Sequence, residues 1–443
     1  MRNTLLLKLL IFLFLFFSVG SLSAQTKPPV KPKPKPKPAP AVNPKPKVAV
    51  KAPNYLDTIL RQNPEYFGAL LKNPAMHKVQ IIYTQINRDK NNKATFVTYS
   101  YHLNKSDFFY AASMVKLPIC ALAMEKMEEL QKFGITPKSI MLTDSAYKCQ
   151  VSCYTDPSAE NGLPSIAQYV KRMLIVSDNQ AYSRVFEFLT PEYINKKLWS
   201  KGYTTARIRI RFDVNCLGIP NNYSNPIRFL NDSGRLLYRQ PPKYYAANTL
   251  SMPVKSTNKL IVYNYPNNII RKDFSKSNYV ALQDFHEILK SIMFPVETPP
   301  NKGFKINTEN RKLLWKYLQM MPYESEFPSY ANREHYIDSY KKYLFYGQDS
   351  TIIINKNIRI FNVVGESYGY TTDVAYIVDF ENKVEFMVSA TYFIQKPNGT
   401  IDATSEMYNA FIMPFFRNLG QAIYNFELQR TKKYLPDLLE YKF

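Results

Sequence analysis

The alternation of apolar and polar residues predicts β-strands near both ends of the chain. Residues 79–86 (VQIIYTQI) and 95–103 (TFVTYSYHL) are rich in β-branched and aromatic residues, and the polar loop DKNNKA between them is typical of a hairpin. Three more runs of this kind follow late in the chain, at 358–364, 374–380 and 384–393. Strands from the two ends must therefore meet to form one sheet.

The middle of the chain shows the three- and four-residue spacing of apolar residues that is typical of amphipathic helices. The first predicted helix covers 112–134 and is closed by Gly134. Further helices are predicted at 165–176, 178–189, 191–199, 281–294 and 309–321, and a long helix at about 404–430 closes the chain. The pattern predicts an α+β fold, in which helices flank a mostly antiparallel sheet and a helical subdomain lies beside it.

The first 54 residues follow a different pattern. Residues 1–24 combine a basic start at Arg2 and Lys8 with the apolar run LLIFLFLFFSV and small residues, which predicts a secretory signal peptide; an uncleaved anchor is the alternative. Residues 25–54 contain a Lys-Pro repeat, which predicts an extended, disordered linker because proline fixes φ and lacks an amide donor. We expect an exported, periplasmic protein whose folded domain covers 55–443 and whose mature form has no transmembrane helix.

Positive charge is concentrated in the same N-terminal segment. The formal net charge of the chain is +23, and residues 1–51 contain ten Lys or Arg and no acid, which leaves +13 for the rest. The remaining charge is spread, so we expect a solvated basic surface and no nucleic-acid partner. The Lys-Pro segment is interpreted as a spacer, with contact to anionic envelope polymers as the alternative.

The cysteine and histidine residues indicate neither a metal nor a cofactor. Cys149 and Cys153 are candidates for a disulfide in an oxidising compartment, although so short a loop is geometrically demanding. Cys120 lies in an apolar helical pattern, which favours a buried thiol. The four His are scattered, no His/Cys/Asp spacing resembles a zinc site, and no glycine-rich phosphate loop occurs.

The strongest chemical candidate is the sequence Ser113-Met114-Val115-Lys116. It is one of four S-x-x-K matches, the others beginning at Ser145, Ser256 and Ser339. Only Ser113 opens a long apolar helix, where Lys116 falls one turn later on the same face. A serine hydroxyl needs a base to become a nucleophile, and a buried lysine can supply it. We predict a catalytic Ser113–Lys116 pair; a helix cap with a surface lysine is the alternative.

A second candidate is Ser177-Asp178-Asn179, which occurs once, at the junction of two predicted helices. Ser177 could relay a proton to a leaving nitrogen, and Asn179 could hold a substrate carbonyl. The alternative is a helix cap, because Ser, Asp and Asn are the favoured cap residues.

S-x-x-K on a helix followed by S-D-N resembles the signature of active-site serine β-lactamases and penicillin-binding proteins. The chain resembles the class A β-lactamase-like family over most of 55–430, and Val363-Val364-Gly365 with the following ESYG resembles its Lys-Thr-Gly strand. Thr372-Asp373-Val374-Ala375 resembles the next strand, with its Asp-x-Ala. The resemblance implies a β-lactamase/DD-peptidase-like fold.

The resemblance also implies roles for the residues of these motifs. Ser113 would form the acyl-enzyme, Lys116 would take its proton, Ser177 would protonate the leaving nitrogen and Asn179 would position the substrate. The oxyanion hole would use the backbone amides of Ser113 and of Glu366, the residue after Gly365.

Two departures from the family pattern matter. Val363 stands where the family has the lysine that attracts a substrate carboxylate, and Asn362 is a poor replacement because alternate strand residues face opposite sides. The nearest match to the deacylating glutamate is Asp213, which is one methylene shorter; a surface or salt-bridged carboxylate is the alternative. Residues 217–278 resemble an insertion that could reshape the cleft.

The leading interpretation is a periplasmic β-lactamase-like serine hydrolase that acts, as a monomer, on a small-molecule β-lactam or related amide. The first alternative is a D-alanyl peptidase or penicillin-binding protein of the same fold, which acts on peptidoglycan peptides and deacylates slowly. The second alternative is a non-catalytic envelope-binding protein, which the missing strand lysine favours and the intact Ser113, Lys116, Ser177 and Asn179 oppose.

Overall fold

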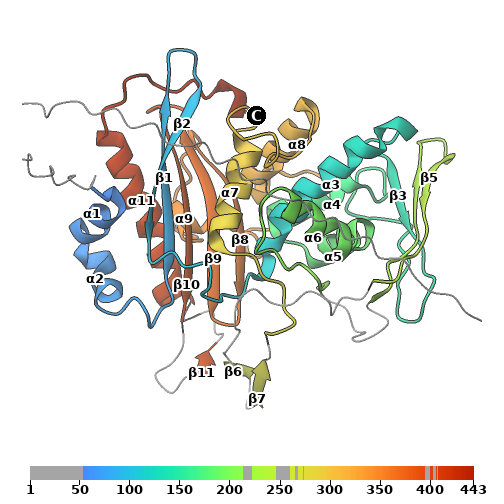
Figure 1. Ribbon diagram of the computed structural model, residues 1–443, viewed down its shortest axis with the longest axis horizontal. Coiled ribbons are helices and arrows are strands. Elements are labelled where there is room, and N and C mark those ends of the chain that lie inside the picture. Colours follow the sequence, from blue (N-terminus) through green and yellow to red (C-terminus); the bar gives the residue numbers. More distant parts are fainter. Residues whose placement is uncertain are drawn as a thin grey trace, which may run out of the picture. The chain divides into compact units, whose positions relative to one another are not determined.

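The computed structural model describes residues 53–212, 222–245, 274–394 and 408–443, together with residue 406 and the short strands 260–264, 268–272 and 400–402 (Figure 1). Residues 53–443 form one compact unit. The predicted signal peptide and nearly all of the predicted linker lie outside the described residues. None of the helices in the described part of the chain combines the length and apolarity that a membrane crossing needs.

Strands from both ends of the chain form one five-stranded antiparallel sheet, as the sequence predicts. Its order is β2-β1-β10-β9-β8, and β1 from the N-terminal half pairs with β10 from the C-terminal half. The strands are β1 (Gln80–Arg88), β2 (Ala94–Tyr101), β8 (Ile358–Ser367), β9 (Tyr370–Asp379) and β10 (Val384–Phe393). This order leaves β8 at an edge of the sheet.

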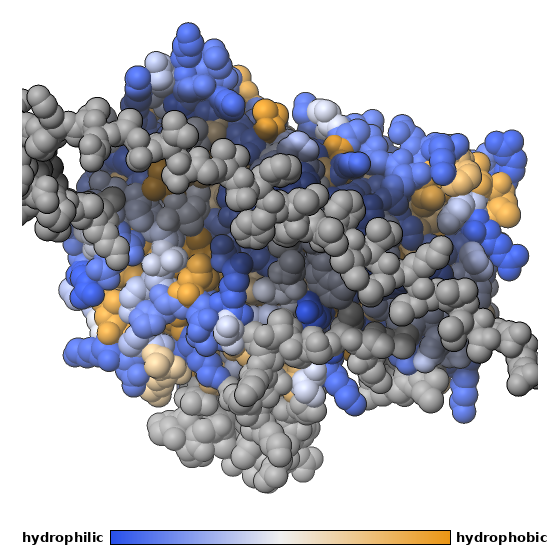
Figure 2. Space-filling model, in the orientation of Figure 1, coloured by the Kyte–Doolittle hydropathy of each residue, from blue (hydrophilic) through white to orange (hydrophobic). Residues whose placement is uncertain are grey.

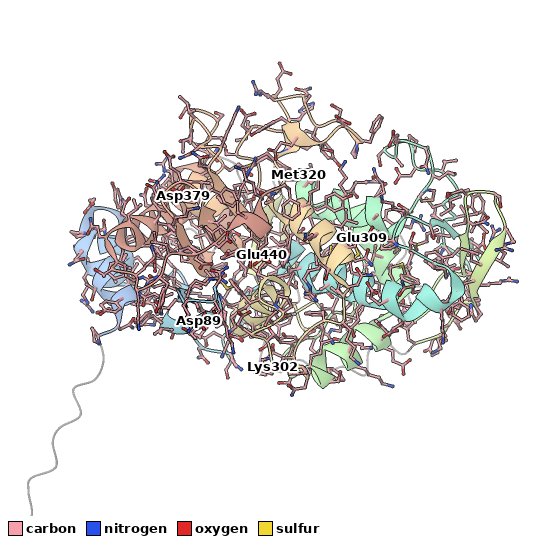
Figure 3. The ribbon with its side chains drawn as sticks, turned by 90° about the horizontal axis from the view of Figure 1, so that it is seen from above. Asp89, Lys302, Glu309, Met320, Asp379 and Glu440 are labelled. Atoms are coloured by element: carbon pink, nitrogen blue, oxygen red, sulfur yellow. The ribbon has the colours of Figure 1, made fainter. Side chains whose placement is uncertain are left out.

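Helices cover both faces of the sheet, so alternate strand residues enter two different cores. Val363, for example, belongs to a core that includes α3, and Val364 belongs to a core that includes α11. The α11 side carries α1 (Tyr55–Gln62), α2 (Pro64–Lys72), the short α9 (Tyr343–Tyr346) and α11 (Met413–Gln429), seen beside the sheet in Figure 1. Asp379, labelled in Figure 3, fastens α11 to the end of β9 by accepting a hydrogen bond from Tyr424 over 2.6 Å.

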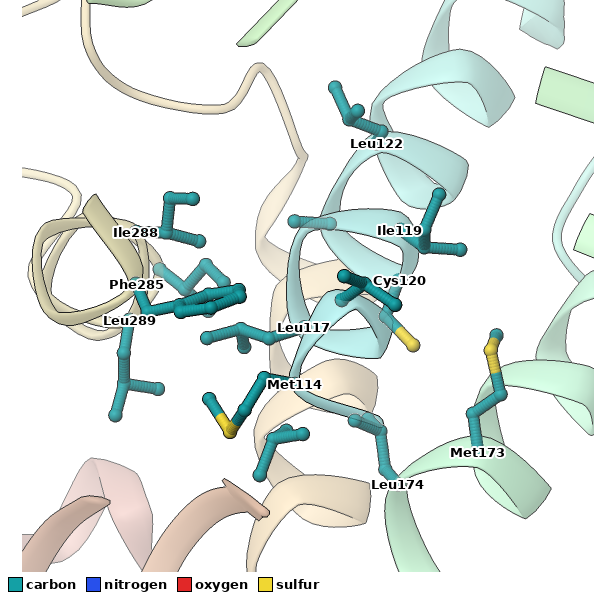
Figure 4. Packing of buried hydrophobic residues seen from close by; sticks show 14 of the residues in the cluster. Met114, Leu117, Ile119, Cys120, Leu122, Met173, Leu174, Phe285, Ile288 and Leu289 are labelled. Atoms are coloured by element: carbon teal, nitrogen blue, oxygen red, sulfur yellow. The ribbon is translucent and has the colours of Figure 1, made fainter. Parts of the chain in front are cut away.

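The helical subdomain lies on the other face and surrounds α3. It comprises α3 (Lys116–Leu130), α4 (Ile166–Val176), α5 (Asn179–Leu189), α6 (Pro191–Ser200) and α8 (Thr308–Gln319), while α7 (Leu282–Met293) packs between α3 and the sheet. The first ten residues of α3 are all buried, because neighbouring helices cover it on several sides. Figure 4 shows Leu117 beside Phe285 of α7, and Cys120 on the side of Met173 of α4.

The helix predicted over 112–134 begins later than expected. Ala112–Val115 form a 3-10 turn, η1, and the regular α-helix starts at Lys116 and ends at Leu130. Pro118 explains the late start, because it has no N–H to donate to the carbonyl four residues earlier. A second 3-10 turn (Gln131–Phe133) follows, and Gly134 closes it in a left-handed conformation, with φ of 76°.

Part of the segment interpreted as an insertion builds two small sheets. In one, β3 (Ile140–Thr143) pairs with β4 (Ile227–Leu230), which pairs with β5 (Leu236–Gln240). In the other, β6 (Leu260–Asn264) lies between β7 (Asn268–Lys272) and β11 (Thr400–Asp402). Figure 2 shows that the face turned to the viewer is mostly hydrophilic, with apolar residues in small separate groups.

The candidate disulfide between Cys149 and Cys153 is wrong. Cys149 is disulfide-bonded, whereas Cys153 is free. The backbone of Cys153 is paired in both directions with Thr143, and its thiol lies 3.5 Å from the hydroxyl of Tyr169. Cys120 is free and buried, as its apolar surroundings in the sequence predict.

Candidate active site

Ser113 and Lys116 face each other at the start of α3. Lys116 Nζ donates a hydrogen bond to Ser113 Oγ over 2.8 Å. The two residues are three apart, and η1 has three residues per turn, so their side chains lie above one another. Lys116 is fully buried, while Ser113 is half-buried and keeps part of its surface open. Ala112, directly before Ser113, has a φ of 45°, a left-handed conformation that costs energy for a residue with a Cβ.

The same lysine forms hydrogen bonds with two of the S-D-N residues, Ser177 and Asn179. Lys116 Nζ donates to Asn179 Oδ1 over 2.7 Å, to Ser177 Oγ over 3.0 Å and also to the Ser177 carbonyl. Ser177 ends α4 in a left-handed conformation, with φ of 61° and ψ of 39°. This turn directs both Ser177 and Asn179 to the lysine. One buried side chain therefore contacts three of the polar residues predicted for the site, Ser113, Ser177 and Asn179.

Asp178 has a structural role between these two residues. Its Oδ1 accepts a hydrogen bond from the Ala181 amide over 2.8 Å, which caps α5. Its Oδ2 lies 2.7 Å from Arg172 Nη2, and Arg172 also pairs with the buried carboxylate of Asp156 over 3.0 Å. The cap interpretation of this motif therefore applies to Asp178, while Ser177 and Asn179 face Lys116.

The edge strand β8 approaches the turn that carries Ser113. A Cβ placed on Gly365 would lie 2.4 Å from the Ala111 carbonyl oxygen and 3.0 Å from the Met114 backbone nitrogen. Only glycine permits so close an approach of the two backbones. Ala111 lies two residues before Ser113 and Met114 directly follows it. Gly365 and the following Glu366 therefore lie next to the nucleophile candidate.

The strand lacks a lysine at the family position, as the sequence shows. Val363 is buried in the α3 core. Asn362 faces the opposite side, where its Oδ1 accepts from Lys342 Nζ over 2.8 Å and its Nδ2 donates to Asp373 Oδ1 over 2.9 Å. Burial lowers the pKa of Lys342 to about 7 and raises the pKa of Asp373 to about 7. Asn362 thus joins a buried network behind the strand and does not replace the missing lysine.

Lys341 is a residue that the sequence reasoning missed. Its Nζ donates to the Tyr343 hydroxyl over 3.2 Å, and its carbonyl accepts from Asn362 Nδ2 over 2.8 Å. Burial lowers the pKa of Lys341, and the nearby carboxylate of Glu366 opposes this effect. A cation therefore lies beside the end of β8. No motif in the sequence marks Lys341; the S-x-x-K match at Ser339 marks the next residue, Lys342.

A cavity of about 530 Å³ lies beside α5, and its lining does not include Ser113, Lys116, Ser177 or Asn179. Gln180, Arg184 and Phe212 are among the residues that line it, and the Phe212 ring centre lies 5.5 Å from Lys116 Nζ. Asp213, the candidate deacylating carboxylate, lies outside the described residues. In the described part of the chain, no group of three or more His, Cys, Asp and Glu side chains is arranged to hold a metal ion.

This arrangement suits acyl transfer. A hydroxyl on a tight turn faces a buried amine that can exchange its proton, and the same amine contacts a second hydroxyl that opens towards the site. The amides of the Ser113 turn and of the adjacent edge strand are the groups that could stabilise an oxyanion.

Comparison with known proteins gives one sequence family and a set of structural relatives. A model of the beta-lactamase enzyme family matches residues 67–426. Similar solved structures include a beta-lactamase from Burkholderia phymatum (12% identity, TM-score 0.44, covering 83% of this chain and 99% of that chain). Another is a class A beta-lactamase from Clostridium kluyveri (10% identity, TM-score 0.44, covering 81% of this chain and 99% of that chain). No curated protein matches the chain. Because the family model spans more than half of its length, this chain belongs to the beta-lactamase enzyme family.

Proposed function

We propose that this protein is an exported serine hydrolase that forms an acyl-enzyme on Ser113 with a β-lactam or a related amide and then hydrolyses it. The observation that carries the proposal is the buried Lys116, whose amine bonds Ser113, Ser177 and Asn179 together. The predicted signal peptide and the Lys-Pro segment support a periplasmic location. The Lys-Pro segment would act as a spacer or would contact anionic envelope polymers.

In the proposed reaction, Lys116 in its neutral form removes the proton of Ser113, and Ser113 Oγ bonds to the substrate carbonyl carbon. The backbone amides of Ser113 and Glu366 stabilise the resulting oxyanion, each by about 3–4 kcal/mol. The proton then passes from Lys116 through the Ser177 hydroxyl to the substrate nitrogen, and the carbon–nitrogen bond breaks. Asn179 holds the substrate next to this path.

Deacylation requires a water molecule and a base that activates it. Asp213 is the candidate base, and its side chain is one methylene shorter than the glutamate of the family pattern. A slow second step would make the protein a penicillin-binding protein or a D-alanyl peptidase. The shorter side chain of Asp213 favours this second candidate, because a base with less reach activates the deacylating water less well.

The test is to incubate the purified protein with a fluorescent penicillin and a chromogenic cephalosporin, and then to measure the intact mass. Turnover supports the hydrolase, and a stable adduct without turnover supports the second candidate. Ser113→Ala should abolish labelling, whereas Ser145→Ala, at an exposed serine of another S-x-x-K match, should not. No adduct and no turnover with lactams and D-alanyl peptides would contradict both candidates.

A further inference from the structure

Three tyrosine rings from separate segments pack against one another at tilted angles on the surface where the β3-β4-β5 sheet ends. The ring centres of Tyr147 and Tyr223 are 4.0 Å apart, and those of Tyr223 and Tyr244 are 5.0 Å apart. The two outer rings are open to solvent, because Tyr147 is 41% exposed and Tyr244 is 56% exposed. The three rings form one exposed aromatic cluster, and contiguous exposed apolar groups often mark binding sites.

The backbone holds these rings in place. Tyr223 and Tyr244 face each other in a β-bridge that continues the β4–β5 ladder. Gln150 links the third ring to them, because its Oε1 accepts from the Tyr147 amide over 3.1 Å and its Nε2 donates to the Tyr223 carbonyl over 3.1 Å. Asn225 Nδ2 also bonds the carbonyl of Asp144 over 2.7 Å, which fixes the same loop. Such a preformed surface loses little conformational entropy when it binds a ligand.

Positive charge flanks the three rings. Lys148 follows Tyr147 and Lys243 precedes Tyr244, and both lysines are exposed. The carboxylate of the same loop, Asp144, is held by Arg228 in a two-point ion pair with distances of 2.8 Å. The surface around the rings therefore favours a ligand that carries negative charge.

The surface is also close to the candidate active site. Cys149 and Val151, from the loop that carries Tyr147, line the same cavity as Gln180 and Phe212. Arg184 donates to the Val151 carbonyl over 2.7 Å and lies five residues after Asn179 on α5, which is roughly 7.5 Å along the helix axis. A long ligand bound at the rings could therefore extend towards Ser113.

We propose that Tyr147, Tyr223 and Tyr244, with Lys148 and Lys243, form a binding surface for an anionic glycan chain. The apolar faces of sugar rings stack on tyrosine rings, the phenol hydroxyls bond sugar hydroxyls, and the lysines pair with the acid groups of the glycan. A stable protein interface buries about 800 Å² on each partner around an apolar centre, which needs more than three tyrosine rings. A nucleic acid would also stack, but it would require a longer track of Lys and Arg. This proposal does not depend on the reaction proposed for Ser113.

The test measures binding of the purified full-length protein to bacterial cell-wall glycan strands from which an amidase has removed the peptides. These strands carry a carboxylate on every second sugar. We expect Tyr147→Ala and Tyr244→Ala each to weaken binding on the order of tenfold, the change that the loss of one aromatic contact produces. Replacing both Lys148 and Lys243 by Gln should weaken binding less and reduce its salt dependence. The matched control is Tyr66→Ala, at a 51% exposed ring on α2, which should bind unchanged.

Several results would overturn the proposal: absence of binding by the unaltered protein, tyrosine variants that bind as tightly as the control, or equal binding of poly-glutamate or a single-stranded oligonucleotide. Tyr244→Leu keeps apolar volume without a ring, so it should also bind weakly while its melting temperature stays near that of the control. Labelling of Ser113 by a fluorescent penicillin should persist in all variants. If even the unaltered protein is not labelled, the reaction proposed for Ser113 fails while the glycan result stands.

Discussion

Two segments of this chain have the same S-x-x-K spacing and a buried lysine, but the serine faces the lysine in only one of them. Ser113 Oγ accepts a hydrogen bond from Lys116 over 2.8 Å. The hydroxyl of Ser339 instead donates to the Asp349 carbonyl over 3.0 Å, and both Ser339 and Lys342 are almost completely buried. The spacing alone therefore does not create a nucleophile.

The partners of the two lysines explain the difference. Lys116 contacts two serine hydroxyls and an asparagine amide oxygen, besides one main-chain carbonyl, that of Ser177. The ring of Phe212, which lines a cavity, lies 5.5 Å from its amine. Lys342 donates to the main-chain carbonyls of Leu318 and Ile360, over 2.8 Å and 2.9 Å, and to Asn362. A lysine bonded to main-chain carbonyls ties α8 to β8, whereas a lysine bonded to hydroxyls can exchange protons with them. The first arrangement stabilises the fold, and the second can support a reaction.

Replacing each lysine by methionine should separate these two roles. Lys116→Met should slow acylation of Ser113 by about 10²–10⁴, the usual contribution of a general base. Lys342→Met should leave the acylation rate within about threefold but lower the free energy of unfolding by about 3 kcal/mol, because buried acceptors lose their donor. Labelling rates with a fluorescent penicillin and urea denaturation measure the two effects. The comparison fails if Lys342→Met slows acylation as much as Lys116→Met does.

Gly365→Ala should disturb the segment that carries Ser113 and Lys116, but not the segment that carries Ser339 and Lys342. A methyl group here would lie 2.4 Å from the Ala111 carbonyl oxygen, so β8 would be pushed away from the turn that carries Ser113. We expect acylation to slow by about 10–100-fold as the oxyanion donors move. Gly68→Ala is the control, because its methyl group would meet nothing closer than 4.0 Å. Unchanged labelling in Gly365→Ala would show that the strand does not form part of the site.

The sequence predicted the sheet and the pairing of motifs, because strand periodicity and motif spacing are local signals. It placed β10 correctly at 384–393 and joined strands from both chain ends. The helix predicted from residue 112 did not take account of Pro118, although a missing N–H is a local signal. The sequence could not show that Cys153 bonds back to Thr143, because that pairing joins residues ten positions apart. Lys341 was also missed, since its approach to Glu366 joins residues 25 positions apart with no periodic pattern.

The buried network of Lys342, Asn362 and Asp373 should make the free energy of unfolding depend on pH. Burial raises the pKa of Asp373 to about 7, so between about pH 4 and pH 7 the folded protein keeps a proton that the unfolded chain releases. The contribution of Asp373 to the free energy of unfolding therefore falls as the pH rises through this window. We expect Asp373→Asn, which does not titrate, to lose less stability than the unaltered protein over this range, by on the order of 4 kcal/mol.

Urea denaturation at several pH values measures this difference. Asp144→Asn is the control with the opposite sign, because the hydrogen bonds from Arg228 lower the pKa of Asp144. Its carboxylate stabilises the fold above its unfolded pKa, and this contribution is lost as the pH falls. Parallel stability curves for Asp373→Asn and the unaltered protein would contradict the assignment of a buried, protonated Asp373.

The smallest expected effect concerns Lys341, which shares the second segment with Lys342 but lies beside Glu366 at the end of β8. With Val363 in place of the family lysine, Lys341 is the cation that we expect to attract a substrate carboxylate. Lys341→Met should raise KM for a cephalosporin about fivefold, the loss of roughly 1 kcal/mol from a partly exposed ion pair, and leave kcat unchanged. The methyl ester of the same cephalosporin should show no change, and Glu366→Gln should lower KM for the acid. An equal rise in KM for acid and ester would mean that Lys341 only stabilises the position of β8, as Lys342 does, and does not bind the substrate carboxylate.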